Sequence, residues 1–598
     1  MNMLRIPVDL KNNYVHMKLN NYAGALICAI LLMFCSCGED FLYRAPQGRV
    51  DKEVLKNAQG VDMLITAAYH NLTQTGWGSS IFNWVYGGIY GGDANTGASA
   101  GSLGEGSWFE AYIIFTSNSY LNEKWTWVYR GSKHVELALK IIDDVTDTNP
   151  NLKKIRQGEL YFLRALFYFE GVKVFGPYMP YIDETNKEND PKVYNDKDIY
   201  PNILADADKA IANLPDKPAE LGRTYSWAAK ALKAKILMQV GRMSEAKPIL
   251  ADILNNGNTA SGLKYALSDD LNDNWSCAMD NKSPESVFEI QFTNDGNNNG
   301  NTGMSLCYPH NGPGGCCGFY QPSFELVNSY QVDDDGLPFL NAEYRSRPSV
   351  TTLIDDGPPD FSVNNKTISV DPRLDFSVGR VGIPYKDYGL TQSMWVRDYY
   401  NGGVFLPKKH VYSQAEADAG LGRTDMSYGW SPGSAMNIQY LSVRDAMLLY
   451  AECLANDGDL SGAMSWVNKI RERAALPVNI IYQEDGTPAA KYSVKPYPAT
   501  HAAFTNKDVC IKAVRMERKL ELAMEGQRWF DLARWGGDYM NAEIDAYLKY
   551  ESNFIRKFKN KTPLAADKTM FPIPQYQIEY MGTDKNGRYY LRQSDPWK

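Results

Sequence analysis

Apolar residues recur with helical spacing over several long stretches of this chain, most clearly at residues 511–537. This stretch contains no proline and repeats a carboxylate every fourth residue, at Glu517, Glu521 and Glu525. Apolar side chains occupy much of another side, which is typical of a long amphipathic helix. Gly526 is its one weak point, and we expect a second, short helical segment after it.

That second segment combines charges with large rings. Arg528, Asp531 and Arg534 are three residues apart, which places a carboxylate between two guanidinium groups on one helical face. Two tryptophans and a phenylalanine fill the positions around them. The pattern predicts an element packed against the rest of the protein. The alternative is a catalytic aspartate with arginine helpers, but nothing nearby in the sequence supplies a nucleophile or a base.

Other helical patterns occur in pairs. Residues 156–175 are apolar around most of the helix circumference, so we expect neighbours on several sides. Residues 224–240 and 243–254 place small residues on facing helices and a glycine between them, as in a tetratricopeptide hairpin. A second such pair covers residues 440–474. Since each pair buries its apolar face only by stacking on another, the pattern predicts a helical solenoid.

Between the pairs the sequence changes character. Asparagine, glycine, proline and aspartate dominate residues 261–436, and short runs such as 286–292 alternate like strands. We therefore predict a mainly α protein in which a large loop-rich, partly β insert at 261–436 interrupts a tetratricopeptide-like scaffold. The scaffold covers residues 45–260 and 437–540, and an irregular segment, 541–598, follows it.

The N-terminal residues predict a lipoprotein signal peptide. The apolar run at residues 23–34 follows a basic stretch and, at about a dozen residues, is too short to span a bilayer. Ser36 and Cys37 follow the run, and a small residue before a cysteine at this place resembles a lipobox, so we predict that residues 1–36 are removed and that Cys37 carries the lipid. A plain secretory signal is the alternative. Met17 would give a signal of ordinary length, which leaves the start open between Met1 and Met17.

Composition narrows the classes of partner. The 598 residues carry a formal net charge of −8 and a pI of about 5.5, which disfavours nucleic acid and anionic membrane surfaces. Aromatic residues make up 12%, with 39 Tyr and 13 Trp, and such a surplus suits a surface that stacks on sugars or peptides.

The sequence predicts no enzyme. Its six histidines are scattered without a pair at zinc-binding spacing, and neither a phosphate loop nor a nucleophile elbow occurs. A glycosidase remains the alternative, because it needs only two carboxylates.

No metal or other cofactor is predicted either. Residues 295–300 fit the first six positions of a calcium loop, but Leu306 stands where a bidentate glutamate is required, so a weak calcium site is the alternative to a turn. Residues 333–336 are interpreted as a solvated acidic turn. Cys453 and Cys510 fall in or beside helical patterns and are expected to be buried thiols. The disulfide state of three further cysteines stays open: Cys307, Cys316 and Cys317.

Two stretches combine flat rings with polar side chains. Rings present their faces to the C–H side of sugars, while aspartate, asparagine and arginine hold hydroxyl groups. The first stretch is also rich in glycine and serine, which is typical of a binding loop. The predicted ligand-binding residues are Trp77, Trp84, Tyr86, Asp93, Asn95 and Trp108 from the first stretch and Tyr308, His310, Phe319 and Tyr320 from the second.

Several blocks of the sequence resemble one known family. EGQRWFDLARWG at 525–536 resembles the C-terminal motif of the SusD/RagB family, the surface lipoproteins that capture nutrients for outer-membrane importers in Bacteroidota. LRALFYFEGVKVFG at 163–176, the block at 440–476, the start at 37–46 and FPIPQ at 571–575 are similar to the family in the same order. The last residues, YYLRQSDPWK, follow the family only loosely.

The resemblance implies a fold and a function. The fold would be a tetratricopeptide-like scaffold with an irregular ligand-binding portion, acting as a lid on a TonB-dependent transporter of the SusC type. Glu39 and Asp40 resemble the signal that sends such lipoproteins to the outer face of the outer membrane. We expect a lipid-anchored protein that binds an oligosaccharide or polysaccharide and delivers it to this transporter. The alternatives are a peptide-binding RagB-like member and a structural subunit without its own ligand site.

Overall fold

The computed structural model describes residues 52–73, 76–186, 192–293, 307–315, 317–351, 366–422 and 434–598. It divides the chain into two units, residues 1–56 and 57–598. Helix α3 (Lys52–Leu55) is the described part of the first unit, and everything below concerns the second. The predicted signal peptide and Cys37 lie outside the described residues.

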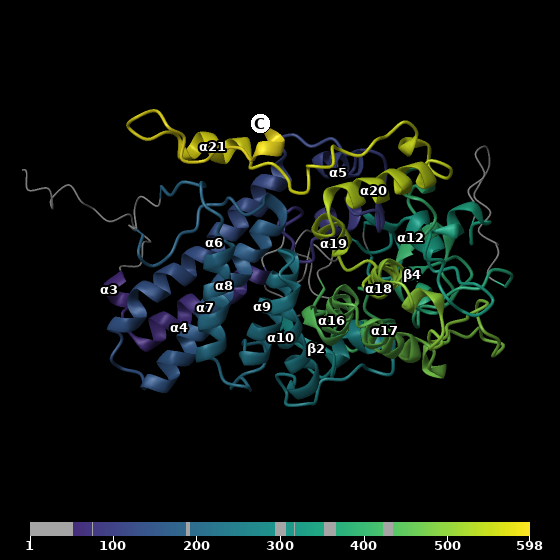
Figure 1. Ribbon diagram of the computed structural model, residues 1–598, viewed down its shortest axis with the longest axis horizontal. Coiled ribbons are helices and arrows are strands. Elements are labelled where there is room, and N and C mark those ends of the chain that lie inside the picture. Colours follow the sequence, from purple (N-terminus) through teal and green to yellow (C-terminus); the bar gives the residue numbers. More distant parts are fainter. Residues whose placement is uncertain are drawn as a thin grey trace, which may run out of the picture. The chain divides into compact units, whose positions relative to one another are not determined.

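Six helices form the first part of the second unit (Figure 1). They are α4 (Ala58–Thr73), α6 (Ser119–Ile141), α7 (Pro150–Phe175), α8 (Tyr200–Asn213), α9 (Ser226–Gln239) and α10 (Met243–Asn256). Each of these helices packs against the next one along the chain, from α4 and α6 to α9 and α10. This successive packing is the arrangement of a helical solenoid, as the paired sequence patterns predict.

Helix α7 shows how the sequence sets such an element. The side chain of Asn149 accepts a hydrogen bond from the backbone N–H of Leu152 at 2.8 Å, and Pro150 occupies the first turn, where its missing N–H costs nothing. Gly176, with φ at 80°, ends the helix. Helices α6 and α8 pack against it, so the expected neighbours on several sides are confirmed.

The second helical part follows the insert. Its members are α16 (Val443–Asp457), α17 (Leu460–Ala474), α18 (Lys507–Glu521), α19 (Arg528–Arg534) and α20 (Gly537–Glu551). Helix α16 contacts α10, α17 and α18 and so joins the two helical parts. Ala451, Ala463 and Ala513 let these helices approach closely around Val467 and Val514. As predicted, Cys453 and Cys510 are buried free thiols.

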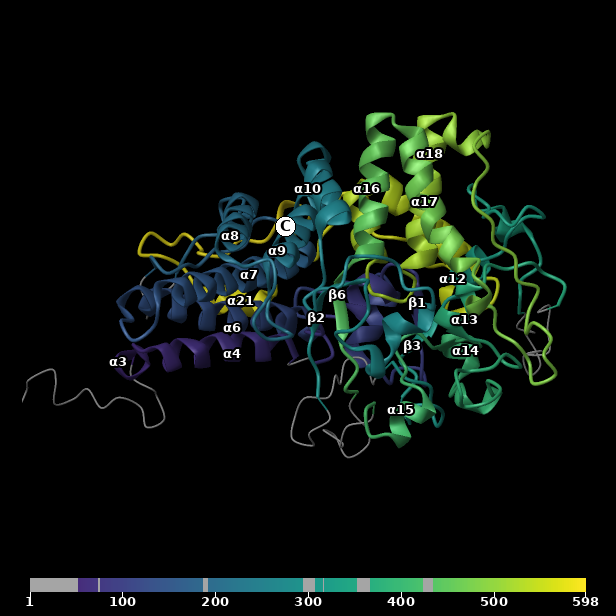
Figure 2. The same ribbon diagram turned by 90° about the horizontal axis from the view of Figure 1, so that it is seen from below.

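The insert contains short elements, as expected. Within the insert, β4 (Val378–Gly379) pairs antiparallel with β5 (Leu406–Pro407). Two other strands of the insert pair antiparallel with strands of the scaffold segments: β3 (Tyr320–Pro322) with β1 (Ala94–Thr96), and β2 (Ser286–Ile290) with β6 (Ile438–Ser442). Its short helices are α12 (Phe324–Ser329), α13 (Arg373–Ser377), α14 (Tyr399–Gly402) and α15 (Gln414–Asp418). In Figure 2 many of these elements lie below the upright helices α16, α17 and α18. The remaining turns of helix are α5 (Ser107–Glu110), the π-helix η1 (Trp84–Ile89) and the 3-10 turns η2 (Gly104–Gly106), η3 (Ile142–Asp144), η4 (Leu271–Trp275), η5 (Cys277–Met279), η6 (Glu343–Ser346), η7 (Ser393–Trp395), η8 (Pro477–Asn479), η9 (Ala502–Phe504), η10 (Arg556–Phe558) and η11 (Asp595–Trp597).

The prediction of an irregular segment from residue 541 was wrong for its first part. Helix α20 continues to Glu551, because Ile544, Tyr547 and Leu548 recur at helical spacing and are buried. A further helix, α21 (Gln575–Met581), follows, with loops and 3-10 turns around it. None of the helices in the described ranges is both long and apolar enough to cross a membrane.

Candidate functional site

The two aromatic stretches selected from the sequence lie against each other. Strand β1 of the first stretch pairs with β3 of the second, with Asn95 opposite Gln321. Next to the strands, the backbone N–H of Gly97 donates to the carbonyl oxygen of Phe319 at 3.1 Å. The rings of Trp77 and Phe319 are 5.3 Å apart between centroids. Residues more than 200 positions apart in the sequence therefore form one local structure.

Most of the predicted ligand-binding side chains nevertheless point inward. Trp84 packs edge-on against Tyr320 at 6.1 Å, and the hydroxyl of Tyr86 donates to the carbonyl oxygen of Tyr120 at 2.8 Å. The buried candidates are Trp84, Tyr86, Asp93, Asn95, Tyr308, Phe319 and Tyr320. These seven side chains are buried in this structure, so none of the rings among them offers its face for stacking on a sugar.

The two polar candidates among them fix the early stretch to the C-terminal helices. Asn95 donates through its side-chain amide to the carboxylate of Glu551 at 2.6 Å. The carboxylate of Asp93 accepts from the backbone N–H of Met524 at 3.3 Å. Burial raises the pKa of Asp93 to about 7, against the opposing effect of Arg528, and burial also raises the pKa of Glu551 to about 7. The carboxyl groups of Asp93 and Glu551 therefore hold the early stretch against the C-terminal segment.

Glycines explain why the rings are enclosed. A Cβ on Gly87 would lie 1.7 Å from the carbonyl oxygen of Gly526, and one on Gly88 would lie 2.0 Å from the hydroxyl of Tyr320. A Cβ on Gly526 would lie 2.0 Å from the carbonyl oxygen of Phe82. These glycines allow two backbones to approach closely, whereas the sequence pattern indicated a loose binding loop.

Three of the ten predicted ligand-binding residues keep partial exposure: Trp77, Trp108 and His310. His310 and Gly97 adjoin a segment that the sequence analysis missed, residues 393–402. The backbone N–H of His310 donates to the carbonyl oxygen of Trp395 at 3.1 Å, and the side chain of Asn401 donates to that of Gly97 at 3.2 Å. The adjacent Tyr399 and Tyr400 of this segment were the available signal.

We define the loop surface as Trp77, His310, Met394, Tyr399 and Tyr400. Met394 is 67% exposed and Tyr400 is 52% exposed. The rings of Tyr399 and Tyr400 are 4.4 Å apart between centroids. Nε2 of His310 lies 3.0 Å from the side-chain nitrogen of Asn311, so polar groups accompany the rings. Accessible rings beside hydrogen-bonding groups are what a sugar-binding surface requires.

The insert loops also bear on the cysteines and the acidic turns. Cys307 is a buried free thiol and Cys317 is disulfide-bonded, while Cys316 and the calcium-like segment 295–306 lie outside the described residues. Asp333 accepts hydrogen bonds from the backbone N–H groups of Asp335 and Leu337, both at 2.9 Å, which confirms the solvated turn. In the part of the chain that the structure describes, no three His, Cys, Asp or Glu side chains form a metal-binding group.

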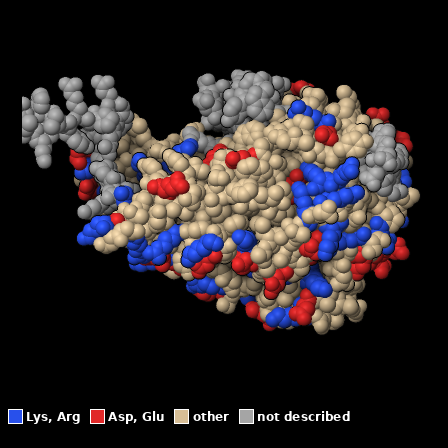
Figure 3. All heavy atoms as spheres, turned by 90° about the horizontal axis from the view of Figure 1, so that it is seen from above, with Lys and Arg blue, Asp and Glu red and all other residues tan. Residues whose placement is uncertain are grey.

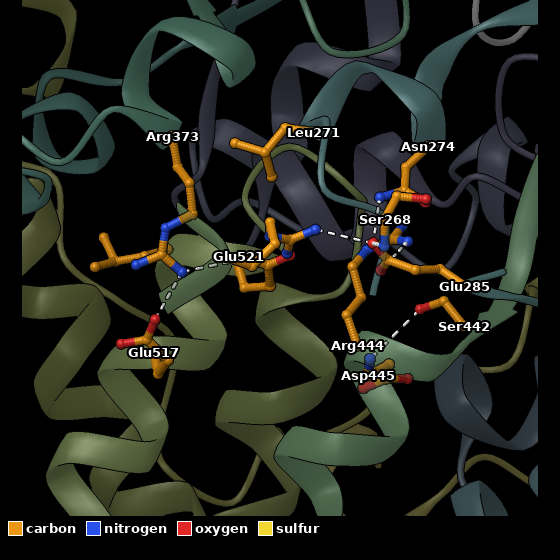
Figure 4. Close-up of polar contacts among 12 residues, drawn as sticks. Ser268, Leu271, Asn274, Glu285, Arg373, Ser442, Arg444, Asp445, Glu517 and Glu521 are labelled. Carbon is orange, nitrogen blue, oxygen red and sulfur yellow. Dashed lines mark hydrogen bonds and ion pairs between the residues drawn. The ribbon is translucent and has the colours of Figure 1, made fainter. Parts of the chain in front are cut away.

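The carboxylates of α18 anchor the insert to the scaffold (Figure 4). Glu517 pairs with Arg373 at 2.6 Å and with Arg471 at 3.1 Å. Glu521 pairs with Arg373 at 3.1 Å and with Arg473. These cations lower the pKa of Glu521 to about 2 although the group is buried.

The same network extends to Glu285, the residue directly before strand β2. Arg473 contacts Glu285 at 2.8 Å, and Arg444 contacts Glu285 at 3.5 Å. The network therefore connects α13, α16, α17 and α18 with the residue before β2 in the interior, where each charge needs its partners.

The charges of α19 are also used in packing. Asp531 pairs with Arg534 at 2.8 Å and, in place of Arg528, with Arg518 of α18 at 3.0 Å. Arg528 instead lies 3.3 Å from Glu543 of α20. The predicted packing role of this segment is confirmed, although one of the two expected arginine partners was wrong.

A groove near the C-terminus has a volume of about 320 Å³ and is lined by tyrosines. The rings of Tyr194 and Tyr590 stack at 4.9 Å, and the guanidinium of Arg588 lies 4.1 Å from the centre of the Tyr194 ring. Tyr178 and Tyr589 are half-exposed at its edge. The sequence analysis left these last residues uninterpreted.

Comparison with known proteins identifies the family. The fold defines a mainly α protein built on a tetratricopeptide-like scaffold. Residues 284–586 match the model of the SusD family, and residues 91–238 match a second model described as "Starch-binding associating with outer membrane". The first match covers half of the chain, and the protein belongs to the SusD family, so the resemblance stated above is confirmed.

Individual relatives agree over most of the length. A SusD-like protein of Bacteroides ovatus is 23% identical over an alignment of 563 residues, and the alignment covers 89% of this chain and 85% of the relative. A laminarin-binding SusD-like protein has a similar structure, with a TM-score of 0.59 and 19% identity over 90% of this chain and 99% of the other. Surface glycan-binding protein A from Bacteroides uniformis also has a similar structure, with a TM-score of 0.62 and 19% identity. The match covers 90% of this chain and 100% of the other. At this identity, the structural likenesses establish the fold.

Proposed function

We propose that this protein binds an oligosaccharide or polysaccharide at the cell surface and delivers it to a TonB-dependent transporter of the SusC type. The observation that carries the proposal is family membership together with relatives named as laminarin-binding and surface glycan-binding proteins. The protein acts by binding and breaks no bond. A peptide-binding protein and a subunit without its own ligand site are the competing functions.

The loop surface is the proposed place of capture. Tyr400 and Met394 are exposed there, and Trp77 and His310 are partly exposed. Rings of this kind stack on the C–H faces of a sugar, while the side chains of His310 and Asn311 hydrogen-bond its hydroxyl groups.

A different face supports docking to the transporter. Ile113 and Phe115, which follow α5, are about half-exposed, and Tyr576 and Tyr580 of α21 are exposed by 62% and 74%. The backbone N–H of Gln575 donates to the carbonyl oxygen of Thr116 at 2.9 Å, which holds the two segments together. Trp108, a predicted ligand residue, packs on Phe115 and so belongs to this face.

This face also has few charges. Figure 3 shows a broad area without charged side chains in the middle of the view from above, the side on which α21 lies in Figure 1. Exposed apolar patches of this kind mark protein–protein contacts. Together with lipid attachment at Cys37, such a contact would hold the protein over a transporter at the outer face of the outer membrane.

Calorimetric titration of the purified protein with neutral polysaccharides and with peptides tests the capture step. We expect a neutral glycan to bind and the variants Trp77→Ala and Tyr400→Ala to weaken its affinity roughly tenfold each, the loss of one well-placed stacking ring. Tyr576→Ala is the matched control, because it removes an exposed ring from α21, and it should bind the glycan normally.

The other outcomes decide between the alternatives. Binding of peptides and of no glycan would replace the proposal by peptide capture. If the folded protein binds neither polysaccharides nor peptides, a structural subunit without its own ligand site is favoured. Co-purification of the transporter from cells tests the docking step, and the Tyr576→Ala/Tyr580→Ala variant should recover less transporter than Tyr400→Ala does.

A further inference from the structure

A basic pocket lies between α18, α20 and the turn η6. Its volume is about 250 Å³. Its charged lining residues are the cations Arg345, Lys512, Arg515, Lys519 and Arg528 and the carboxylate Glu543. In Figure 3 lysines and arginines gather toward the right of the view, the side on which α18 and α20 lie in Figure 1. This concentration of cations stands out in a chain whose formal net charge is −8.

Two carboxylates neutralise part of the pocket. Glu325, buried beside it, contacts Arg345 at 2.7 Å and Lys519 at 3.0 Å. Glu543 contacts Arg528 at 3.3 Å and lies 3.9 Å from Arg345. Five cations thus face two carboxylates, which leaves a local excess of three positive charges.

The excess is concentrated on Arg515 and Lys512. The guanidinium of Arg515 lies over the rings of Trp535 and Tyr539, at 4.6 and 4.4 Å from their centres. Among the described residues it has no carboxylate within ion-pair distance, and its Nε is buried without an acceptor. Lys512, one turn earlier on the same face of α18, donates to the side-chain oxygen of Asn341 at 3.0 Å.

The two rings fix the position of Arg515 before any ligand arrives. A guanidinium is itself a planar fork of N–H groups, which matches two oxygens of one anion, and contacts with aromatic rings on it restrict its movement. Since its position is set in advance, little conformational entropy is lost when an anion binds. Lys512, whose side chain is exposed, adds a second positive charge to the lining.

We propose that this basic pocket binds an oxyanion, the carboxylate or sulfate group of an acidic glycan. Arg515 and Lys512 hold the oxyanion, and Arg345 and Arg528 contribute positive potential from their ion pairs. The choice of a glycan as its source rests on the proposed function, whereas the oxyanion site itself rests on the pocket. The pocket and the loop surface lie on different elements. The loop surface would bind sugar rings, and the pocket would favour those glycans that carry a negative charge.

Titration of the purified full-length chain with three probes tests the proposal: inorganic sulfate, an oligogalacturonate and a sulfated oligosaccharide. We expect an acidic glycan to bind and its affinity to fall with rising salt concentration. Arg515→Gln should weaken it about tenfold, and Arg515→Gln/Lys512→Gln should remove measurable binding. Lys549→Gln, which removes one charge from the exposed face of α20, should leave affinity unchanged. Thermal unfolding of each variant verifies that it is folded.

The probes separate the sources of the oxyanion. Binding of the uronate alone assigns a carboxylate, binding of the sulfated sugar alone assigns a sulfate, and binding of both assigns a shared site. Inorganic sulfate reports on the pocket without any sugar, through a rise in Tm that is larger in the wild type than in the double variant. If inorganic sulfate raises Tm in this way but neither acidic glycan binds, the proposal that the oxyanion belongs to a glycan is overturned. Equal affinity of the double variant and the wild type, or the absence of every effect, overturns the pocket.

The neutral glycan titration keeps this test independent of the proposed function. The double variant should bind a neutral glycan as the wild type does, because the loop surface is untouched. Loss of neutral binding in the Tyr400→Ala variant alone concerns the proposed function and leaves the pocket unaffected.

Discussion

The early ring-rich stretch, residues 76–108, and the C-terminal segment, residues 507–551, are the two sides of one buried contact. Both are rich in large aromatic rings, but they achieve burial differently. The early stretch uses glycines, so that the backbone at Gly87 can touch the backbone at Gly526. The C-terminal segment uses paired charges, in which Glu517 and Glu521 meet arginines from other elements.

The comparison shows that each of the two sequence patterns is compatible with two different structures. Glycine beside aromatic rings describes a binding loop and a tightly packed backbone crossing equally well. Charges at helical spacing describe a solvated face and a buried ion network equally well. In this protein both patterns belong to the interior.

The largest expected effect comes from the charged side. Arg473→Met leaves Glu285 and Glu521 with fewer partners in the interior, so we expect the free energy of unfolding to fall by about 3–5 kcal/mol. Urea unfolding measures the change. The control Arg242→Met breaks the exposed pair with Glu245 and should cost less than about 1 kcal/mol. Equal losses in the two variants would show that the buried network is not the stabilising element.

The close backbone contact between the two sides, at Gly87 and Gly526, should respond nearly as strongly. Gly526→Ala places a methyl group against the carbonyl oxygen of Phe82 at a residue whose φ is 66°, and we expect a loss of about 3 kcal/mol. Gly486→Ala separates the two causes, since its φ is 77° but nothing lies within 4 Å of the added Cβ. It should lose only about 1 kcal/mol in the same urea experiment. A Gly526→Ala variant no less stable than this control would argue against a close crossing.

Ring exposure is the next test of the comparison. Trp84→Ala empties a fully buried site and should cost about 3 kcal/mol in urea unfolding. Tyr400→Ala removes an exposed ring of the loop surface and should change the free energy of unfolding by less than about 0.5 kcal/mol. The reverse order would mean that the early stretch faces solvent, as the sequence pattern suggested.

The smallest effect is a dependence on pH. The folded pKa of Asp93, about 7, lies above the unfolded value of about 4, so its stabilising contribution is complete below pH 4 and is lost as pH rises through 7. The wild type should therefore lose up to about 1.4 kcal/mol per pH unit from this group between pH 5 and 7. Asp93→Asn should show a flatter profile in urea unfolding over that range. If the free energy of unfolding depends on pH equally in the wild type and in Asp93→Asn, a group other than Asp93 takes up the proton.

Glu521 provides the opposite sign. Its folded pKa of about 2 lies below the usual value, so its contribution is complete above about pH 4.5 and is lost as pH falls through 2. Acid unfolding thus reports on the charged side. In the neutral range, where Glu551 also titrates, the difference between the wild type and Asp93→Asn reports on the early stretch.

Much of the scaffold could be predicted from periodicity and capping residues. The pair at 440–474 appears as α16 and α17, and the break expected at Gly526 falls between α18 and α19. These features are local, so a few neighbouring residues determine them. Helix α20 was missed although its buried residues repeat at helical spacing, because the surrounding loops obscured the pattern.

The candidate site could be predicted only in part. The sequence selected two stretches that do pair through β1 and β3. It could not determine which way each ring points, because the inward orientation of Trp84 depends on a glycine contact with a segment far along the chain. The basic pocket was not foreseen for the same reason, since Arg345 and Arg515 come together only through the tertiary fold.

The contact between the early stretch and the C-terminal turn also constrains how the chain is made. Asp93 and Met524, which hydrogen-bond to each other, are 431 residues apart. The rings synthesised first have no packing partner until nearly the whole polypeptide has emerged, and contacts of such long sequence separation form slowly. A chain that stops before residue 524 would leave its early rings exposed to proteases and to aggregation. Burial of the early rings therefore requires that the last helices have been synthesised and have folded.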